Sequence, residues 1–342
     1  MPVSQEVVSQ YAPVVYFHPN ERFFPCSIDY LLQNAVLRDR NQPDWSTPNP
    51  TQATLAQFST PNYYVAIAPS QSGGMGIRAP MYYAVQEYDD AVEITYAMLY
   101  AEHGGQTCRA LRLLSEFDCI VETLGMHQGD LERVVVTLIP QPGGQYRVLR
   151  VGYESHGDMT YFPTHSIAWE GTHPVVNSAL NGHSSHSIKA QGDRIVDFEV
   201  PLIVSIVSAL GAGLAWRPFD SGGLLQLGLD ASGKPIGSQV WAAFAGRLGD
   251  QQTNQLDGAT YFDGSNLSGA DWAFVKLTDW VARLLGKYPE NILEGNGPTG
   301  PGDRAWIKPA SGKLLGDALT VLTATSDVGQ GPGAVAWLSA RR

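Results

Sequence analysis

One imidazole and two carboxylates, those of His127, Asp130 and Glu132, fall within six consecutive positions of the chain. They stand where a polar, glycine-containing segment gives way to the apolar run 134–139 (VVVTLI), which predicts a β-strand. Side chains two positions apart on a strand share a face, so Asp130 and Glu132 should point the same way. Like charges placed together need a cation, a proton or water. The spacing therefore predicts a divalent-cation cluster.

The donor atoms of this cluster limit the choice of cation. Carboxylate oxygens favour Mg²⁺, Ca²⁺ or Mn²⁺, whereas the imidazole of His127 keeps Zn²⁺ or Fe(II) open. The alternative is a salt-bridge network in which the two acids pair with Arg133 or Arg150. Both interpretations put a polar site at the start of the same predicted strand.

Two further histidines end predicted strands and could move protons at such a site. His156 lies in the tetrapeptide Ser-His-Gly-Asp at 155–158, and His183 lies in the polar stretch 181–186. We predict that both are general acids or bases, because imidazole titrates near neutral pH. The serines after His183 are not within a Gly-x-Ser-x-Gly elbow, so a hydrolase triad is not indicated.

The charge balance of the chain excludes some partners. Of its 342 residues, 33 are acidic and 22 are basic, and the formal net charge is −11. Such a chain repels nucleic acid and anionic membranes unless it has a basic patch, and the sequence contains none. Cys26, Cys108 and Cys119 are too few for a disulfide framework; a bridge between Cys108 and Cys119 is the alternative, but the odd, sparse set favours free thiols in a reducing compartment. The first residues resemble no signal peptide, so we expect a cytoplasmic protein.

The longest apolar run, Pro201–Trp216, is shorter than the ~20 residues that span a bilayer and contains two glycines. It predicts a buried helix rather than a membrane span. A second interpretation makes it the wall of an apolar pocket. We therefore expect no integral membrane segment.

Short β-rich runs separated by turns dominate the middle of the chain, and they predict a mainly β protein. The runs lie at 81–85, 91–100, 133–139 and 146–153, and the turn 142–144 (PGG) joins the last two as a hairpin. Helices are predicted at 28–32, capped by Ser27, and from Ser268 onward. Residues 40–61 are predicted to form a surface loop, and residues 104–124 are predicted to be irregular.

We predict one domain over residues 1–342, an antiparallel β-sandwich with flanking helices. Residues 1–61 would be an N-terminal helix and loop arm, and 62–200 the core strands with the metal site. Residues 201–342 would hold the apolar helix, further strands and a C-terminal helix.

Several segments resemble the vacuolar-protein-sorting-62-like family in the same order along the chain. They are YAPVVYFHPNE at 11–21, HQGDLE at 127–132, SHG at 155–157, PVVNSAL at 174–180 before His183, FAGRLG at 244–249 and GPGD at 300–303. This sequence departs from that family at Leu131 and Leu248, where the family usually has tryptophan. The resemblance implies a shared scaffold and a possible role for His183.

The His-x-x-Asp-x-Glu string also resembles that of the necrosis-inducing, cytolysin-like proteins, which are β-sandwiches that bind a divalent cation through this spacing. The resemblance implies that His127, Asp130 and Glu132 are metal ligands. It further implies that His156 either contacts a metal ligand without binding the metal or acts as a general base, and that His103 or Glu102 supplies a further ligand.

Three functions follow from these patterns. The first is a divalent-metal-dependent enzyme that acts on a small, largely apolar substrate by hydrolysis, elimination or cyclisation. The second is a non-enzymatic protein that binds a lipid or glycan head group through the cation. The third is a structural cation that ties loops together.

Overall fold

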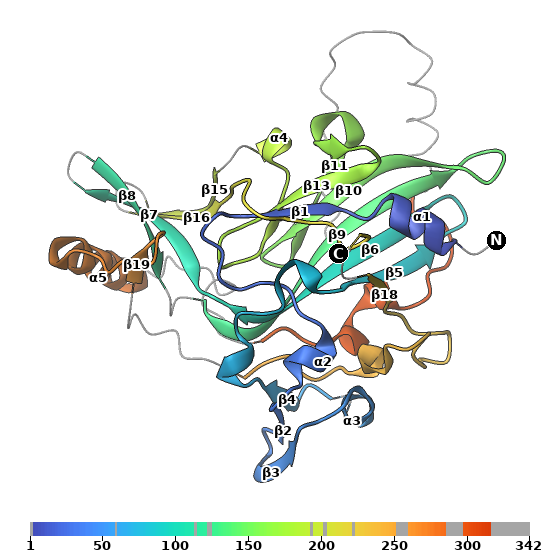
Figure 1. The fold of residues 1–342 in the computed structure, drawn as a ribbon, viewed down its shortest axis with the longest axis horizontal. Helices are drawn as coiled ribbons and strands as arrows, with labels where there is room; N and C mark the ends of the chain where they lie inside the picture. The colour runs from blue at the N-terminus through green and yellow to red at the C-terminus, as the bar shows by residue number, and fades with distance from the viewer. Residues whose placement is uncertain are drawn as a thin grey trace.

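The computed structural model describes residues 3–58, 60–112, 115–121, 125–191, 194–200, 204–220, 223–250, 259–284 and 297–315. Its strands form four sheets, and two of these face each other across a hydrophobic core (Figure 1). The prediction of a mainly β, sandwich-like fold is therefore confirmed.

The central sheet contains six strands in the order β11-β10-β9-β6-β5-β18, and only β18 and β5 run parallel. Its middle strands β6 and β9 pair over their length, from Val92 opposite Leu138 to His103 opposite His127. All of β6 is buried, because other elements cover both faces of the sheet. The strands are β5 (Met81–Glu87), β6 (Val92–His103), β9 (His127–Pro140), β10 (Tyr146–Ser155), β11 (Asp158–Pro163) and β18 (Leu224–Gln226).

A second sheet, in the order β12-β13-β1-β17, covers one face of the central sheet, and its short strand β14 pairs with β13. Val15 and Trp216 of this sheet lie in one buried cluster with Tyr96 and Val136 of the central sheet. Strand β1 pairs in parallel with β13, so residues 1–61 contribute a strand to the sandwich as well as helices and loops. The strands are β1 (Val14–Phe17), β12 (Trp169–Glu170), β13 (His173–Ser178), β14 (Ser185–His186) and β17 (Ala215–Trp216).

The opposite face of the central sheet packs on a layer of short helices and a three-stranded sheet in the order β3-β2-β4. Residues 40–61 are not the predicted loop, because they contain β3 and α3. Ser27 caps α2 as predicted, since its side chain accepts a hydrogen bond from Tyr30 N. The elements are β2 (Val36–Asp39), β3 (Gln42–Pro48), β4 (Tyr63–Ala66), α2 (Ile28–Leu31), α3 (Gln52–Gln57), η1 (Pro69–Gln71), η2 (Gly76–Arg78), η4 (Val240–Ala243), η5 (Pro301–Asp303) and η6 (Ala305–Ile307).

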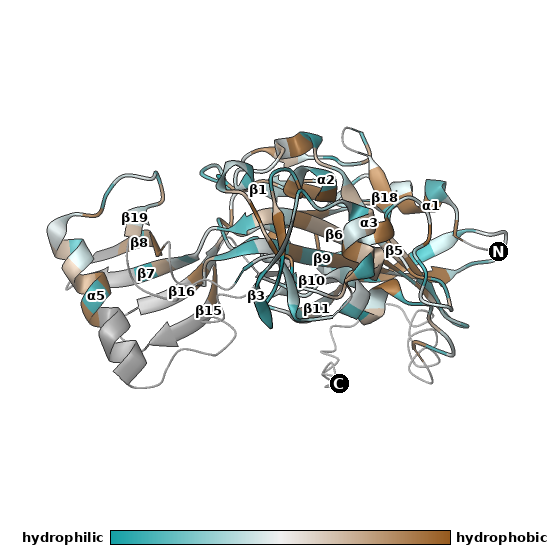
Figure 2. Ribbon diagram, turned by 90° about the horizontal axis from the view of Figure 1, so that it is seen from below, coloured by the Kyte–Doolittle hydropathy of each residue, from teal (hydrophilic) through white to brown (hydrophobic). Residues whose placement is uncertain are grey.

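A further sheet, in the order β15-β16-β7-β8-β19, extends from one end of the sandwich and carries helix α5 (Figure 2). The Ser268 hydroxyl accepts a hydrogen bond from Asp271 N at 3.2 Å, which confirms it as the start of α5. The elements are β7 (Gln106–Arg112), β8 (Ser115–Val121), β15 (Arg194–Val200), β16 (Val204–Ala209), β19 (Ala259–Tyr261) and α5 (Gly269–Leu284); helices α1 (Gln5–Gln10), α4 (Ile188–Gln191) and η3 (Thr164–Ser166) lie elsewhere.

Two sequence predictions in this region are wrong. Residues 104–124 are not irregular, because they contain the paired strands β7 and β8. The helix predicted for 201–216 is instead strand β16, paired with β7 and β15, followed by β17; residues 201–203 lie outside the described chain. The valines and isoleucine of β16 are β-branched and suit a strand. No helix in the described part of the chain is long and apolar enough to cross a membrane.

Candidate functional site

The paired ends of β6 and β9 bring two imidazoles together. His103 and His127 are register partners, and their rings stack with centroids 4.7 Å apart. The Nδ1 atom of His127 lies 2.7 Å from the carbonyl oxygen of Gly129, which holds the ring in place. Two histidines that are far apart in the sequence therefore form one edge of a site.

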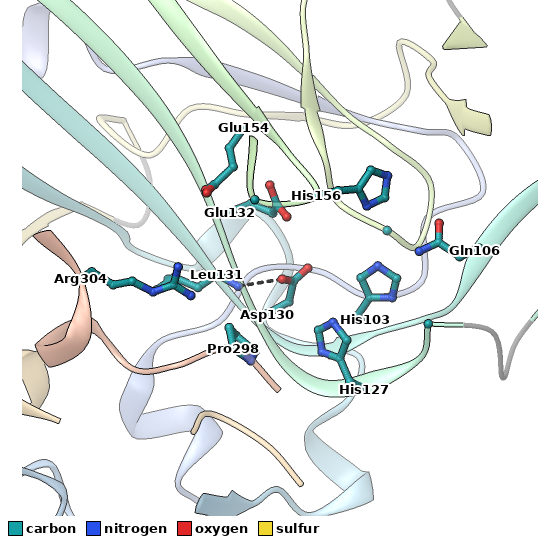
Figure 3. Close-up of a pocket in the computed structure, with 13 residues that line it drawn as sticks. His103, Gln106, His127, Asp130, Leu131, Glu132, Glu154, His156, Pro298 and Arg304 are labelled. Carbon is teal, nitrogen blue, oxygen red and sulfur yellow. Dashed lines mark hydrogen bonds between the residues drawn. The ribbon is translucent and has the colours of Figure 1, made fainter. Parts of the chain in front are cut away.

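Asp130 and Glu132 lie two positions apart on β9, and both line the same pocket (Figure 3). His127 lines it as well, although it is three positions from Asp130. Gly129, between them, has a φ of 69°, a left-handed conformation that interrupts the alternation of side chains along the strand. The three predicted side chains therefore line one pocket.

His156 reaches the pocket from the tight turn between β10 and β11. Ser155 pairs with Asp158 across this turn, and His156 and Gly157 both have positive φ angles, of 51° and 84°. A two-residue type I′ hairpin requires two residues in the left-handed conformation, and histidine adopts that conformation at a small cost in conformational free energy. The turn places the imidazole beside the two carboxylates.

His183 lies behind the pocket rather than in it. Its ring stacks on Tyr100 with centroids 3.8 Å apart, and its Nδ1 lies 3.0 Å from Oδ2 of Asp130. Its Nε2 lies 3.8 Å from Oε1 of Glu21, too far for a hydrogen bond but close enough for charge attraction. His183 is fully buried. Its position suits support of Asp130 more than contact with a ligand.

The pocket has a volume of about 210 Å³, and most of its lining is polar. Residues 204–216, from the run predicted as an apolar wall, do not line it, and neither does Glu102. The lining residues are His103, Gln106, Gly125, His127, Asp130, Leu131, Glu132, Glu154, His156, Gly157, Gly182, Pro298 and Arg304.

The two carboxylates of the cluster differ in protonation. Burial and the neighbouring charges of Asp130 and Glu154 raise the pKa of Glu132 well above its usual value. Burial alone would also raise the pKa of Asp130, but the hydrogen bond with His183 lowers it overall. Oε2 of Glu132 is buried and has no hydrogen-bond partner among the described residues. One acid is therefore ionised and paired with an imidazole, while the other keeps its proton to a higher pH.

The three imidazoles at the site also differ in protonation. Burial lowers the pKa of both His103 and His127, so both are neutral near pH 7. Burial also acts to lower the pKa of His183, but the hydrogen bond with Asp130 and the charge of Glu21 raise it to about 9. The protein therefore supplies neutral imidazoles to the pocket and a buried imidazolium behind it.

The predicted salt-bridge alternative does not account for the cluster. Arg133 pairs with Glu154, with Nε 2.7 Å from Oε2, and Arg150 lies 3.4 Å from the Glu93 carboxylate. Neither arginine forms an ion pair with Asp130 or Glu132 in the described part of the chain.

The types of donor fit a divalent cation, since carboxylates and neutral imidazoles line one pocket and the buried Oε2 of Glu132 has no hydrogen-bond partner among the described residues. Within the described residues, no three such side chains already converge as a coordination shell would. A cation would therefore have to draw the side chains inward.

Three site residues were missed from the sequence. Glu21 follows β1, Glu154 is the last residue but one of β10, and Arg304 follows η5. Glu154 lies two positions before His156, and this short spacing could have identified Glu154 as a candidate site residue from the sequence. Glu21 and Arg304 reach the site only through long-range packing.

The comparison with protein families agrees, over the start of the chain, with the expected resemblance to the vacuolar-protein-sorting-62-like family. The family model described as vacuolar protein sorting-associated protein 62 matches residues 1–58, which include Glu21. No curated protein matches the chain.

Several solved structures show a low similarity to this chain. They include the non-toxic HaNLP3 protein (14% identity, 66% of this chain, 76% of that chain, TM-score 0.31). Another is necrosis and ethylene inducing protein 2 from the causal agent of cocoa's witches' broom disease (16% identity, 56% of this chain, 71% of that chain, TM-score 0.30). A third is NLPPya in complex with glucosamine (12% identity, 66% of this chain, 75% of that chain, TM-score 0.31).

Proposed function

We propose that the pocket binds a divalent cation and, together with it, a small polar ligand such as a sugar or a lipid head group. The observation that carries this proposal is the buried Oε2 of Glu132, which has no partner among the described residues and lies beside the ionised Asp130. A bound cation would satisfy both carboxylates at once. It would also relieve the repulsion that raises the pKa of Glu132.

The residues that would hold the cation are Asp130 and Glu132, with His103 and His127. Both imidazoles are neutral near pH 7, the state in which their nitrogens can bind a metal. His183 would hold Asp130 in place through their 3.0 Å contact, as partners of metal-binding side chains commonly do.

The lining of the pocket supports a polar ligand rather than the largely apolar one expected from the sequence. His156 and Arg304 lie on either side of Asp130, and both can donate hydrogen bonds (Figure 3). Hydroxyl, phosphate and carboxylate oxygens are acceptors that match such donors. A cation between them would bind the same oxygens.

The test is calorimetric titration of the chelator-treated chain with Mg²⁺, Ca²⁺, Mn²⁺ and Zn²⁺, and then with glucosamine, mannosamine, phosphocholine and inorganic phosphate. We expect one cation to bind and one ligand class to bind only in its presence. Asp130→Asn should abolish both, while Asp44→Asn, at an exposed position, should change neither. Ligand binding that is equal with and without the cation would overturn the proposal.

The chelation step of this experiment distinguishes a structural cation from a ligand-binding one. If chelation removes the cation and the circular dichroism spectrum stays native, the cation does not merely tie loops together. If chelation unfolds the chain, the structural interpretation is the better one.

A metal-dependent hydrolase or lyase is the second candidate, and one observation favours it. The pKa values of Asp130 and Glu132 are pushed in opposite directions, as in sites where one carboxyl donates a proton and the other stays ionised. A bound divalent cation would supply Lewis-acid polarisation of a substrate oxygen. In this candidate Asp130, His103 and His127 alone would hold the cation. Glu132 could then keep its proton and donate it, and His156 would accept one.

Turnover distinguishes the two candidates. An enzyme should convert a ligand found by titration into product, and Glu132→Gln should lower kcat far more than it weakens ligand binding. A ligand recovered unchanged after prolonged incubation with the loaded protein favours binding alone.

A further inference from the structure

Cys108 and Cys119 lie directly opposite each other on neighbouring antiparallel strands. The pairing of β7 with β8 runs from Gln106 opposite Val121 to Arg112 opposite Ser115, and the two cysteines are register partners within it. Opposed residues of an antiparallel pair project to the same face of the sheet. The register alone therefore brings the two thiols together.

The packing agrees with the register. Both cysteines belong to one small buried cluster with Val121 and Val275, under helix α5. Cys108 is 3% exposed and Cys119 is 0% exposed, and neither is part of a disulfide. The third cysteine, Cys26, lies in a different cluster, so it is no partner for either.

The backbone geometry suits a covalent bridge. Opposed Cα atoms in antiparallel strands are about 4.5 or 5.5 Å apart, depending on whether the pair is hydrogen-bonded. Both distances fall inside the range of about 4.4 to 6.8 Å found for disulfides. A bridge here needs rotation of the side chains but no movement of the strands.

We propose that Cys108 and Cys119 are a redox-sensitive pair that closes into a reversible cross-strand disulfide in the presence of a hydroperoxide. The Cys108 sulfur, the more exposed of the two, attacks one peroxide oxygen and breaks the O–O bond. This gives a sulfenic acid and, for hydrogen peroxide, water that carries the thiol proton. The Cys119 sulfur then displaces the sulfenic oxygen, which leaves with the Cys119 proton as a second water. Two thiols and one peroxide thus become one disulfide and two waters.

The bridge would lie close to the candidate site. Gln106, which lines the pocket, stands two positions before Cys108 on β7. Linking β7 to β8 limits local opening of this hairpin. Oxidation should therefore slow hydrogen exchange in the hairpin more than in the central sheet.

The test treats the reduced full-length chain with hydrogen peroxide, blocks the remaining thiols with iodoacetamide and measures the intact mass and the peptide map. We expect one blocked thiol, at Cys26, a linked pair of peptides containing Cys108 and Cys119, and full reversal by dithiothreitol. The reduced chain should be blocked at all three positions under denaturing conditions.

Matched variants complete the experiment. Cys26→Ser should still form the bridge, whereas Cys119→Ser should stop at a sulfenic acid that dimedone traps at Cys108. Sulfinic acid at Cys108 with Cys119 still open to alkylation in the wild-type chain, a bridge that includes Cys26, or no oxidation of either thiol would overturn the proposal. The wild-type peptide map decides the matter even if a variant does not fold.

Discussion

Nδ1 of His183 lies 3.0 Å from Oδ2 of Asp130, and both groups are buried, so the pocket carboxylate is supported from behind by an imidazolium. Glu21 lies on the other side of the same ring. This arrangement keeps a negative charge at the pocket surface while a positive charge inside the protein compensates it.

Replacing His183 with glutamine should strongly destabilise the fold. It leaves the buried carboxylates of Asp130 and Glu21 without their shared positive charge, and breaking one side of a buried pair costs about 3 to 5 kcal/mol. Urea unfolding at pH 7 measures the loss. His165→Gln is the matched control, because His165 is exposed whereas His183 is fully buried; an equal loss in both variants would contradict the predicted charge role.

The unfolding free energy of the wild-type chain should decrease as the pH rises above neutral, because His183 loses its proton. Its pKa in the folded state is about 9, above the unfolded value of about 6.5, so its contribution is complete below the unfolded value. That contribution is lost as pH rises from about 6.5 through 9, and by linkage it amounts to about 3 kcal/mol. Unfolding free energies measured from pH 6 to pH 10 should show this decline in the wild type and a flatter profile in His183→Gln.

Replacing Glu132 with glutamine should stabilise the metal-free chain at alkaline pH. The pKa of Glu132 is raised on folding, so stability is lost as pH rises from the unfolded pKa, about 4.3, through the folded one. The variant should therefore melt higher than the wild type at pH 8 and little differently at pH 4. Thermal melts of both, with the exposed Glu6→Gln as control, measure the difference.

Cation binding near neutral pH should release a proton from Glu132. The raised pKa keeps this carboxyl protonated above its normal range, whereas His103 and His127 are already neutral. Calorimetry in buffers of different ionisation enthalpy counts the released protons. The release should disappear in Glu132→Gln, and a release that persists there would assign the proton to another group.

His156 offers a way to separate the turn from the site. Asparagine accepts the left-handed conformation of this position, so His156→Asn should change the unfolding free energy by less than about 0.5 kcal/mol. His156→Val should cost about 1 to 2 kcal/mol, because a β-branched residue resists a positive φ. Ligand affinity should fall in both variants; unchanged affinity in His156→Asn would exclude a contact between this imidazole and the ligand.

Gly129→Ala should destabilise the start of β9 by about 2 kcal/mol or more. A Cβ atom there would lie 1.4 Å from the carbonyl oxygen of Leu248, and the φ of 69° disfavours any L side chain. Gly143→Ala, also at positive φ but with open space around it, isolates the steric part. Similar melting temperatures for the two variants would show that the contact with Leu248 is easily relieved.

The parts of the site that were predictable depend on local geometry. Asp130 and Glu132 meet in one pocket because the period of a strand is two, and Ser27 and Ser268 cap helices because their hydroxyls lie beside the first turn. Such features need only neighbouring residues, and the sequence contains them.

The remainder depends on packing across the chain. Residues 204–209 form a strand because β7 and β15 pair with them, and an apolar run alone does not distinguish a buried strand from a buried helix. His183 was predicted as a group near the reaction, yet its stacking on Tyr100 and its contact with Asp130 place it behind the pocket.

The route of the chain through the site has a consequence for how the protein folds. Glu21 supports the site from near the start of the sequence, and Arg304 lines the pocket from a segment close to its end. Contacts between such distant positions form late and slowly, because the loop between them must close first. Ligand affinity would then appear only in the last step of folding, and it would report the completed chain rather than any of its sheets.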